Sequence, residues 1–568
     1  MQETALIHST MLTKIVSSLE KCYHNENIKT KREIKSFSML KNERASFQMA
    51  YCLDPRQKFS MHFRTAELEI ESPIKDFIKV RRVSHVPSLM PIYKDHCDSG
   101  MTRTDVGLYP DALLPMDGNR LMVYNHLNSL WIDIEGEGLK AGVYPITLRL
   151  RRTKANNTME LDPQYEPCEA TLTVEVIDAM LPAQTTKFTQ WFYCDCLQVY
   201  YETESFDDKH WLAIESFMKT AVKNGINMIL TPLFTPPLDT APGLERPTTQ
   251  LIDVALNNGE YSFGFEKLDR WIALCDKVGV EYFEINHMFT QWGCHNCPKV
   301  MATVDGEYRR IFGWDTAATG EEYSRFLRTF IPQFIAHMKE KNCDKRMYFH
   351  VSDEPSQKHL DSYKAARDLL YPLVKDYPII DAMSHVEFFD QGLCRIPIPH
   401  NGAVQDFLDR DVKERWTYYC CGSGEGLSNR LMCMPSERNR IIGAQMYKYN
   451  VKGFLHWGYN FYFNEYSFAP LNPWNNTDGD GFSPSGDCFS VYPGPRCTCI
   501  ESLRLKVFYD ALQDQRALEL CESLYSRDFV ISLIDEGITP LEFNNYPRDP
   551  QYLLNLREKV NAAIKAKL

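Results

Sequence analysis

Residues 347–355 read MYFHVSDEP, an apolar run that ends in two adjacent carboxylates and a proline. The apolar run predicts a short buried strand, and Pro355 ends it because proline cannot donate a ladder hydrogen bond. Asp353 and Glu354 therefore follow a strand directly, at the edge of a predicted sheet, and are the first candidates for chemistry. They could instead cap the helix expected to begin near Ser356, although Ser356 could cap that helix itself.

The same rhythm of apolar strand, polar loop and amphipathic helix repeats from about residue 187 onward. Eight such units are the number expected of a (β/α)8 TIM barrel, whose catalytic residues lie at the carboxyl ends of the strands. A doubly wound sheet is the structural alternative, but no G-x-G-x-x-G or Walker loop accompanies it. The expected strands are 188–193, 226–232, 282–288, 346–351, 379–385, 396–404, 415–421 and 453–459, and the expected helices are 210–224, 266–278, 321–341, 357–374 and 437–449.

Alternation of apolar and polar residues dominates the first part of the chain, for example at 146–150 and 172–176. Short alternating strands separated by turn residues predict an antiparallel β-sandwich. A helix is expected over about residues 12–23. We therefore predict a multidomain chain. Its parts are an N-terminal β-sandwich at 1–182, the catalytic barrel at 183–525, and a short C-terminal helical extension at 526–568 that packs on the barrel and ends in a helix at 552–567.

The composition of the 568 residues is that of a globular protein, with 44% hydrophobic and 24% charged residues. A formal net charge of −12 argues against nucleic acid or an anionic membrane as the main partner, because both require a basic face. No apolar stretch is long enough for membrane insertion. The first residues include Glu3, His8 and Lys14, so we expect no signal peptide and a cytoplasmic location.

The chain contains 18 cysteines, of which Cys294 and Cys297 form a C-x-x-C pair. Structural zinc generally requires four ligands and no second C-x-x-C is present, so we predict no metal and no cofactor. Without a secretory signal, reduced thiols are favoured over a disulfide framework. A zinc or redox protein built on these cysteines is the last-ranked alternative, and it would contain bound metal.

The residues at the ends of the other expected strands restrict which glycosidase mechanism the Asp353–Glu354 pair could serve. A retaining glycosidase with its own nucleophile places two carboxyls about 5–5.5 Å apart on separate elements. No Asp or Glu ends the strands at 415–421 and 453–459, and the nearest candidate is Glu425 in a Gly-rich loop. We infer that the substrate supplies the nucleophile, as the carbonyl oxygen of a 2-acetamido group that forms an oxazoline. Glu354 then acts as acid and base, while Asp353 accepts the acetamido N–H and stabilises the developing positive charge.

Three stretches in the second half of the chain carry a resemblance to a known family. They are HVSDEP at 350–355, KGFLHWGY at 452–459 and GDCFSVYPG at 486–494, the last followed by Ser502 and Arg504. Together they resemble the motifs of glycoside hydrolase family 123, the β-N-acetylgalactosaminidases. The resemblance implies a β-sandwich before the barrel, a retaining substrate-assisted mechanism and no metal. It also implies that Asp353 is the stabiliser and Glu354 the acid/base.

Further substrate contacts are expected from residues at strand ends, with a core role as the alternative for each. Trp457 and Tyr459 are expected to form the floor beneath the sugar and the wall of an acetamido pocket. Tyr419 is expected to align the acetamido oxygen. The other candidates are Asn286, His287 and His385 for ring hydroxyls, Trp191 and Trp292 as aromatic contacts, and Asp487 and Tyr492, which lie in the third motif.

The leading hypothesis is an exo-acting β-N-acetylgalactosaminidase on the non-reducing end of glycans, such as those of glycosphingolipids. A β-N-acetylglucosaminidase of the same mechanism is an alternative, because the two sugars differ only at the 4-hydroxyl. A non-catalytic glycan-binding protein is the alternative from another class, and the intact Asp353–Glu354 pair argues against it.

Overall fold

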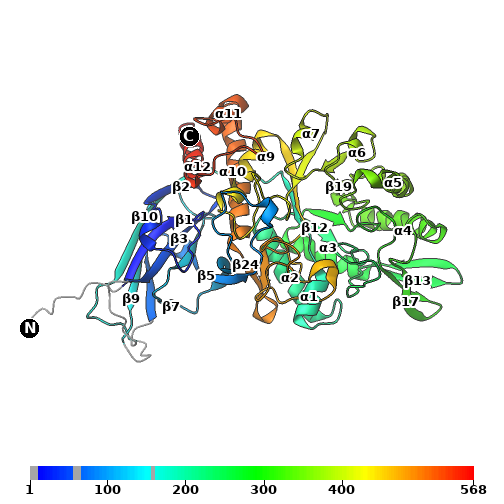
Figure 1. Cartoon of the computed structure of the whole chain (residues 1–568), viewed down its shortest axis with the longest axis horizontal. Helices are drawn as coiled ribbons and strands as arrows, with labels where there is room; N and C mark the ends of the chain where they lie inside the picture. The colour runs from blue at the N-terminus through cyan, green and yellow to red at the C-terminus, as the bar shows by residue number, and fades with distance from the viewer. Residues whose placement is uncertain (1–10, 55–64, 155–159) are drawn as a thin grey trace, which may run out of the picture.

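The computed structural model describes residues 11–54, 65–154 and 160–568. Two regions lie side by side, a pair of β-sheets from the N-terminal part of the chain and a larger region of parallel strands and helices (Figure 1). Residues 1–10, on which part of the signal-peptide prediction rests, lie outside the described residues. Among the helices of the described ranges, none has the length and apolar character needed to cross a bilayer.

The N-terminal region is a sandwich of two five-stranded sheets, as predicted. The strand pairings are antiparallel, except that β2 and β10 pair in parallel. Alternate side chains fill the space between the sheets, and Ile146, Leu172 and Val174 are buried there. The first sheet has the order β1 (Met11–Ser17), β3 (Arg44–Leu53), β8 (Asn128–Glu135), β5 (Ile78–Ser88), β6 (Gly107–Pro115), and the second the order β2 (Ser36–Leu40), β10 (Cys168–Ile177), β9 (Gly142–Arg152), β4 (Thr65–Glu71), β7 (Arg120–Met122).

The helix expected over residues 12–23 is wrong. Met11–Ser17 form strand β1, which pairs antiparallel with β3 along its whole length. Ile15 and Val16 are β-branched and buried. Such residues pack well on a pleated surface, so an available strand edge overrides the local helical pattern.

The second region contains the eight expected parallel strands, divided over two sheets. Six of them form the order β18-β15-β12-β11-β22-β21, and β19 pairs with β20. Single parallel bridges, Phe349 with Ile379 and His400 with Tyr418, link the two sheets. The first strand pairs with the last, as in a barrel and unlike an open doubly wound sheet. The strands are β11 (Lys187–Gln190), β12 (Met228–Thr231), β15 (Tyr282–Ile285), β18 (Met347–Tyr348), β19 (Ile380–Ala382), β20 (Ile396–Ile398), β21 (Arg415–Tyr418) and β22 (Val451–His456).

The predicted continuous barrel is therefore interrupted in the described residues. The expected strand at 346–351 shortens to the two residues of β18. The reason is that the N–H groups of Val351 and Ser352 donate to the side-chain carboxylate of Asp381 in β19 instead of to a backbone carbonyl of that strand. Polar side chains thus replace the ladder where the strands reach the candidate site.

Helices connect the strands, and the five that the sequence predicts are present, the one expected at 437–449 as the two short helices α8 and α9. The short helices α1, α6 and α7 were not predicted. The longer helices pack an apolar face inward, as α3 does with Leu268, Trp271 and Ile272, whereas the buried residues of the short helix α8 are polar or charged. The helices are α1 (Cys194–Tyr201), α2 (Asp208–Lys223), α3 (Glu266–Val278), α4 (Glu321–Glu340), α5 (Leu360–Val374), α6 (Glu387–Asp390), α7 (Val404–Leu408), α8 (Glu437–Arg440) and α9 (Ile442–Lys448).

Two inserted hairpins interrupt this alternation and have no counterpart in the sequence prediction. One follows β12 and the other follows β15, and together they form a four-stranded sheet that projects beside α4 (Figure 1). A further short hairpin, β23 (Val491–Pro493) with β24 (Cys499–Glu501), precedes the C-terminal helices. The projecting sheet consists of β13 (Asp253–Asn257), β14 (Glu260–Gly264), β16 (Val300–Val304) and β17 (Glu307–Phe312).

Three C-terminal helices contact both regions. They are α10 (Leu503–Leu524), which is buried on most sides, α11 (Arg527–Ile534) and α12 (Pro550–Lys565). Leu40 and Trp131 of the sandwich share one apolar cluster with residues of α10 and α12. The closing helix expected at 552–567 is present as α12, and it packs against the sandwich as well as against α10.

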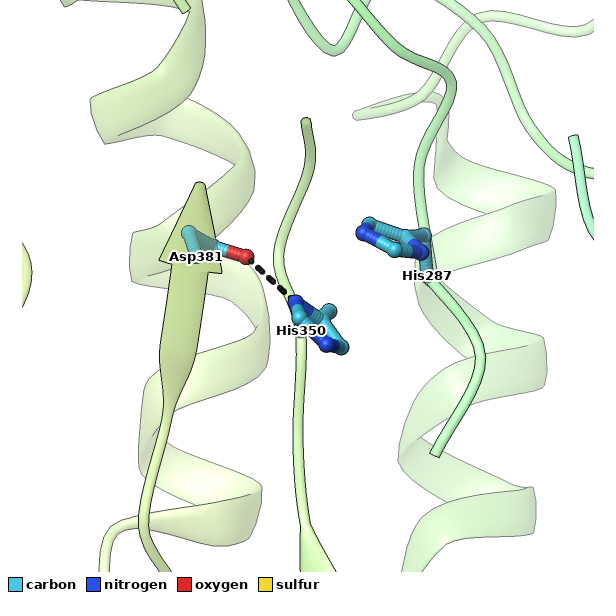
Figure 2. Close-up of side chains that lie close together, drawn as sticks. All are labelled: His287, His350 and Asp381. Carbon is cyan, nitrogen blue, oxygen red and sulfur yellow. Dashed lines mark hydrogen bonds and ion pairs between the residues drawn. The ribbon is translucent and has the colours of Figure 1, made fainter. Parts of the chain in front are cut away.

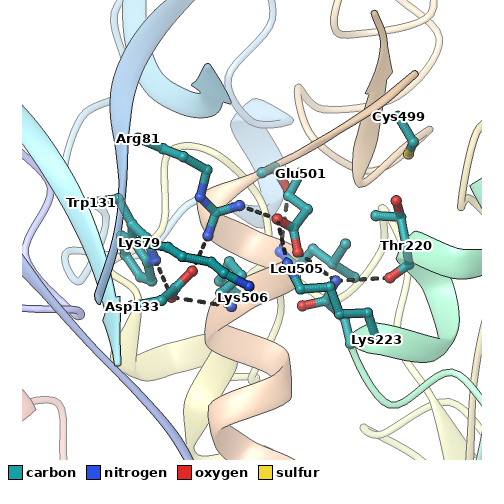
Figure 3. A network of polar contacts seen from close by, with 12 residues as sticks. Lys79, Arg81, Trp131, Asp133, Thr220, Lys223, Cys499, Glu501, Leu505 and Lys506 are labelled. Atoms are coloured by element: carbon teal, nitrogen blue, oxygen red, sulfur yellow. Dashed lines mark hydrogen bonds and ion pairs between the residues drawn. The ribbon is translucent and has the colours of Figure 1, made fainter. Parts of the chain in front are cut away.

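A buried ion network joins the two regions beside α10 (Figure 3). Asp133 of β8 and Glu501 share Arg81 of β5. The ammonium group of Lys506 on α10 lies 3.2 Å from Asp133, and that of Lys223 on α2 lies 3.5 Å from Glu501. Burial alone would raise the pKa of both carboxyls, but the surrounding cations outweigh it. They hold the pKa of Asp133 well below its usual range and lower that of Glu501 to about 2.

Candidate active site

Asp353 and Glu354 lie just beyond β18, at the carboxyl ends of the parallel strands. Two backbone hydrogen bonds fix them, from the Trp292 N–H to the Asp353 carbonyl at 3.1 Å and from the Glu354 N–H to the Ala382 carbonyl at 3.0 Å. Glu354 has a φ of 41°, a left-handed conformation that is uncommon for a residue with a side chain. Strain of this kind persists only where the surrounding structure holds it, and it is frequent at functional sites.

The two carboxylates do not cap the helix that follows them. Ser356 and His359 close that helix start, with the Ser356 N–H donating to His359 Nδ1 at 3.2 Å and the His359 N–H donating to the Ser356 carbonyl at 2.8 Å. The capping alternative is therefore wrong, and both acids are left for another role.

A tyrosine of β21 holds Glu354. The Tyr418 hydroxyl donates a short hydrogen bond to Glu354 Oε1. Part of the Glu354 side chain is accessible to solvent. Its carboxyl is nevertheless surrounded by protein, and this burial raises its pKa. The hydrogen bond from the Tyr418 hydroxyl opposes the rise.

Tyr419, the tyrosine expected at the site, faces the opposite side of the strand. It is fully buried, and its hydroxyl donates to Asn439 Oδ1 at 2.9 Å. Successive side chains of a strand point to opposite faces. The tyrosine hydroxyl that contacts the carboxylate pair is therefore that of Tyr418, one residue before the predicted Tyr419.

Asp353 is only 9% exposed. Within the described part of the chain, no group donates a hydrogen bond to its carboxylate. Burial raises the pKa of Asp353, the neighbouring acids Glu354, Asp239 and Asp381 raise it further, and His350 opposes them. Because Asp353 and Glu354 repel each other when both are ionised, the pair holds a proton to higher pH than an isolated carboxyl would.

A third carboxyl near the pair was missed by the sequence analysis. Asp239 lies in the loop after β12, where the Tyr193 hydroxyl donates to its Oδ2 at 3.2 Å and its own N–H donates to Gln291 Oε1 at 2.6 Å. Burial raises the pKa of Asp239 to about 6, and the charges of Glu354 and Asp487 add to the rise. No motif or strand end marks Asp239, so only the fold reveals its position.

Asp487 and Trp457, both expected at the site, lie in contact. Trp457 Nε1 donates to Asp487 Oδ2 at 2.9 Å, the Ser483 hydroxyl donates to the same oxygen at 2.7 Å, and His456 Nε2 lies 3.3 Å from Oδ1. Burial alone would raise the pKa of Asp487, but its contacts with His456 and Ser483 lower it. A charged, fully buried Asp487 thus orients Trp457, which is half-buried and keeps one part of its ring accessible.

The two other expected tryptophans differ in their exposure to solvent. Trp292 is 39% exposed, is tied to Asp353 through its backbone, and packs edge-on against Tyr466 with ring centroids 5.7 Å apart. An exposed ring beside the carboxylates is suited to stacking on a sugar. Trp191 is buried and donates to Glu284 Oε1 at 2.8 Å, so it supports the site rather than lining it.

Three of the expected substrate contacts are buried and hydrogen-bonded to other parts of the chain. Tyr459 is fully buried and donates to a backbone carbonyl of α2 at 2.9 Å. Tyr492 is buried and donates to Asp111 of the sandwich at 2.6 Å. Asn286 is buried and accepts a backbone N–H of the loop after β12 at 3.3 Å. These three have structural partners, which corrects their expected role, and His385 is exposed in the loop after β19.

His350, three residues before Asp353, lies between two buried carboxylates, of which Figure 2 shows Asp381. Its Nε2 is 2.8 Å from Glu284 Oε1, and its Nδ1 is 3.2 Å from Asp381 Oδ1. The expected residue His287 stacks on it, with ring centroids 4.1 Å apart and an interplanar angle of 22°. Glu284 and Asp381 were missed, although an acid inside each of the apolar strands expected at 282–288 and 379–385 was an available signal.

His287, His350 and Asp381 also form the group of described residues whose ligand atoms could meet at a metal ion, all within 4.8 Å of one another. Both ring nitrogens of His350 already face carboxylates, so a metal would have to displace one of them. The donor set therefore fits a hydrogen-bonded imidazolium better than a metal centre. The 18 cysteines are free thiols, and none belongs to this group. The expectation of no metal and no cofactor stays a prediction.

Parallel strands that end in two adjacent carboxyls with raised pKa, beside accessible aromatic rings, are the arrangement of a glycoside hydrolase. The model of the glycoside hydrolase 123 catalytic domain matches residues 191–521, which is more than half of the chain. The protein belongs to glycoside hydrolase family 123, as the three sequence motifs indicated.

Solved structures agree on the fold. A family 123 glycoside hydrolase from Clostridium perfringens, studied for its hydrolysis of glycolipid glycans, superposes with a TM-score of 0.71 at 14% identity and covers 98% of this chain and 97% of its own. At that identity the likeness shows the shared fold alone. A putative β-galactosidase from Bacteroides fragilis (9% identity, 84% and 59% coverage, TM-score 0.29) and a family 5 mannosidase from Rhizomucor miehei (13% identity, 57% and 92% coverage, TM-score 0.32) are too dissimilar to support an argument. No curated protein matches the sequence.

Proposed function

We propose that the protein is a retaining exo-glycosidase that removes terminal β-linked N-acetylgalactosamine by substrate-assisted catalysis. The observation that supports this most is the difference between its two adjacent acids. Asp353 has carboxylate oxygens to which no described group donates, whereas Glu354 is held by Tyr418. Asp353 is therefore suited to accept the N–H of a 2-acetamido group, and Glu354 to exchange a proton with the glycosidic oxygen.

The protonation of the pair fits this division of roles. Burial raises the pKa of both acids and each opposes the ionisation of the other, so that the pair keeps its last proton to a higher pH than an isolated carboxyl would. Asp353 is raised more strongly and holds this proton in the free enzyme. When the acetamido N–H donates to Asp353, its ionised form is stabilised and the proton passes to Glu354. Substrate binding thus protonates Glu354, the acid of the first step.

The reaction then follows in two steps. Glu354 gives its proton to the leaving oxygen while the acetamido carbonyl oxygen attacks C1, and an oxazoline forms. The Glu354 carboxylate next takes a proton from water, which opens the oxazoline at C1 with net retention. Asp353 stabilises the positive charge on the acetamido group in both steps. Two adjacent residues of one loop are poorly placed to flank a sugar from opposite sides, as a protein nucleophile and its acid do.

Asp239 is the residue that would supply a protein nucleophile in the alternative mechanism, because it comes from a separate loop. Burial raises its pKa to about 6, however, so that below this pH Asp239 is mostly protonated and lacks the charge that a nucleophilic carboxylate needs. We propose that Asp239 instead binds a sugar hydroxyl and helps to keep the proton on the Asp353–Glu354 pair.

The sugar is proposed to rest on Trp457, with Trp292 on the leaving-group side and Tyr418 beside the acid. In this proposal the two parallel sheets act as one (β/α)8 barrel at 183–525, between a sandwich at 1–182 and the C-terminal extension at 526–568. Because the Clostridium perfringens enzyme acts on glycolipid glycans, we propose such glycans as the natural source of the substrate here.

Turnover of three p-nitrophenyl β-glycosides tests the proposal. We expect the N-acetylgalactosaminide to be hydrolysed fastest, the N-acetylglucosaminide more slowly, and the galactoside, which lacks the acetamido group, not detectably. Equal rates on the galactoside, or a covalent glycosyl–protein adduct, would contradict substrate assistance. Binding of N-acetylgalactosamine without any hydrolysis would favour the glycan-binding alternative.

A further inference from the structure

A buried histidine next to the catalytic motif carries a fixed positive charge. His350, Glu284 and Asp381 are all fully buried, and each ring nitrogen of His350 lies within hydrogen-bond distance of one carboxylate. An ionised carboxylate only accepts hydrogen bonds, so both ring nitrogens must carry a proton. The ring is then an imidazolium at neutral pH.

The other partners of the two carboxylates agree with this charge state. Glu284 also accepts from the Thr189 hydroxyl and from Trp191 Nε1. Asp381 also accepts from the Tyr363 hydroxyl and from backbone N–H groups. Apart from the His350 ring itself, every described contact of either acid is a donor to it, so a carboxyl proton would have only a His350 nitrogen to donate to, and imidazole is the more basic of the two groups. Burial alone would lower the pKa of His350, but Asp381 and Glu284 outweigh it and raise the pKa to about 9.

We propose that Glu284, His350 and Asp381 form a fixed charge cluster whose imidazolium favours the ionised form of Asp353. His350 is then a positioning residue for the reaction, although it touches no reacting atom. The inference rests on the proposed function, in which Asp353 must be ionised to accept the acetamido N–H.

The charges around Asp353 explain why such a cation is needed. Glu354 adjoins it in sequence, Asp239 faces it from the loop after β12, and Asp381 faces it from β19, and all three disfavour its ionised form. Among the largest influences on Asp353, His350 is the one that favours the charged form. Without the imidazolium, the pKa of Asp353 would be higher still, and its proton would pass less readily to Glu354 when the acetamido N–H binds.

His287 covers the face of the His350 ring. Both of its ring nitrogens are buried without a hydrogen-bond partner among the described residues, and burial followed by the charge of His350 lowers its pKa well below the usual range. The stacked ring is therefore neutral. It excludes water from the imidazolium, so that the charge acts on Asp353 with little screening.

Three variants test the net charge of the cluster, which is −1 for two carboxylates and one imidazolium. His350→Gln makes it −2, Glu284→Gln makes it zero, and the double variant restores −1. We expect the acidic limb of kcat/KM on the p-nitrophenyl N-acetylgalactosaminide to rise by about one pH unit in the first and to fall by a similar amount in the second. In the double variant it should return close to the wild-type position, which mere structural damage would not produce.

The matched control is Tyr363→Phe, which removes a hydrogen bond to Asp381 and leaves every charge in place. It should lower the unfolding temperature without moving the acidic limb. Circular dichroism and thermal unfolding show which variants are folded. Acidic limbs that coincide in all folded variants, or whose order does not follow the net charge, would overturn the inference.

A measurement that needs no activity separates this inference from the proposed function. In protein with 15N-labelled histidine, the His350 signal, identified by its loss in His350→Gln, should show two protonated ring nitrogens up to about pH 8. A neutral ring at pH 7, or a stoichiometric transition metal in the purified protein, would refute the charge cluster. If the wild-type protein hydrolyses none of the three glycosides, it is the proposed function that fails.

Discussion

Replacing Tyr418 by phenylalanine removes the hydroxyl that donates to Glu354 and leaves the ring in place. The hydrogen bond stabilises the ionised carboxylate, so its loss raises the pKa of Glu354 above its already raised value. A hydrogen bond to a charged group contributes about 1.5–3 kcal/mol, and one pKa unit corresponds to about 1.4 kcal/mol. We therefore expect the pKa of Glu354 to rise by about one to two units.

The pH dependence of kcat/KM on an aryl N-acetylgalactosaminide measures this change. Its basic limb reports the loss of the proton that Asp353 and Glu354 share, and because Tyr418 stabilises ionised Glu354, the limb should move to higher pH by about one unit in Tyr418→Phe. The kcat near pH 6.5 should also fall, by roughly tenfold, because Glu354 loses a group that orients it for proton transfer.

Tyr419→Phe is the matched control, since it makes the same chemical change one residue along the strand. It removes the donor to Asn439 Oδ1 and leaves a buried amide oxygen without that partner, which should cost about 1–3 kcal/mol of folding stability. The pH profile should keep its wild-type position. A basic limb that moves in Tyr419→Phe and not in Tyr418→Phe would refute the assignment of the two faces of β21.

Four further outcomes are expected. Glu354→Gln should lose most activity on poor leaving groups and less on activated aryl glycosides, whereas Asp353→Asn should lose it on both, as steady-state kinetics on the two substrate types will show. Asp239→Asn should lower kcat/KM but leave measurable turnover, and complete loss that azide rescues with inversion would instead identify Asp239 as the nucleophile. A thiazoline mimic of the oxazoline should inhibit competitively, and no inhibition would count against the acetamido group as nucleophile. Because the pKa of Glu501 falls from 4.5 to about 2 on folding, its ion pairs contribute about 3 kcal/mol above pH 5, which is lost as the pH falls toward 2. Thermal unfolding of Glu501→Gln should accordingly show a large destabilisation at pH 7 that falls to roughly half at pH 3.

The positions of the parallel strands and of the helices between them could be predicted because burial of a strand or of a helix face is a local, periodic property of the sequence. The points where the hydrogen-bond ladders end could not. β18 stops after two residues because the N–H of Val351 donates to the carboxylate of Asp381, which lies 30 residues further along the chain. A partner that distant leaves no trace in the local pattern.

The candidate site could be predicted where a residue directly follows a strand, as Asp353 and Glu354 do. The choice between Tyr418 and Tyr419 could not be made, because both faces of β21 are buried and the alternation that would fix the phase is absent. Asp239 was missed for another reason, since it lies in a loop that only the fold carries to the carboxylate pair.

The direction of the pKa shift distinguishes the buried carboxyls of the ion network from those of the candidate active site. Burial acts in the same direction on the carboxyls of the ion network and on those of the site. In the network, Arg81 and the neighbouring lysines outweigh burial and lower the pKa of Asp133 and Glu501, which stabilises the joined regions and leaves no proton to exchange at neutral pH. At the site, Asp353 and Glu354 are raised by burial and by nearby acids, which costs folding stability and keeps a proton available. A purely structural role would not account for two adjacent acids left without a paired cation, whereas proton transfer to a leaving group requires that arrangement.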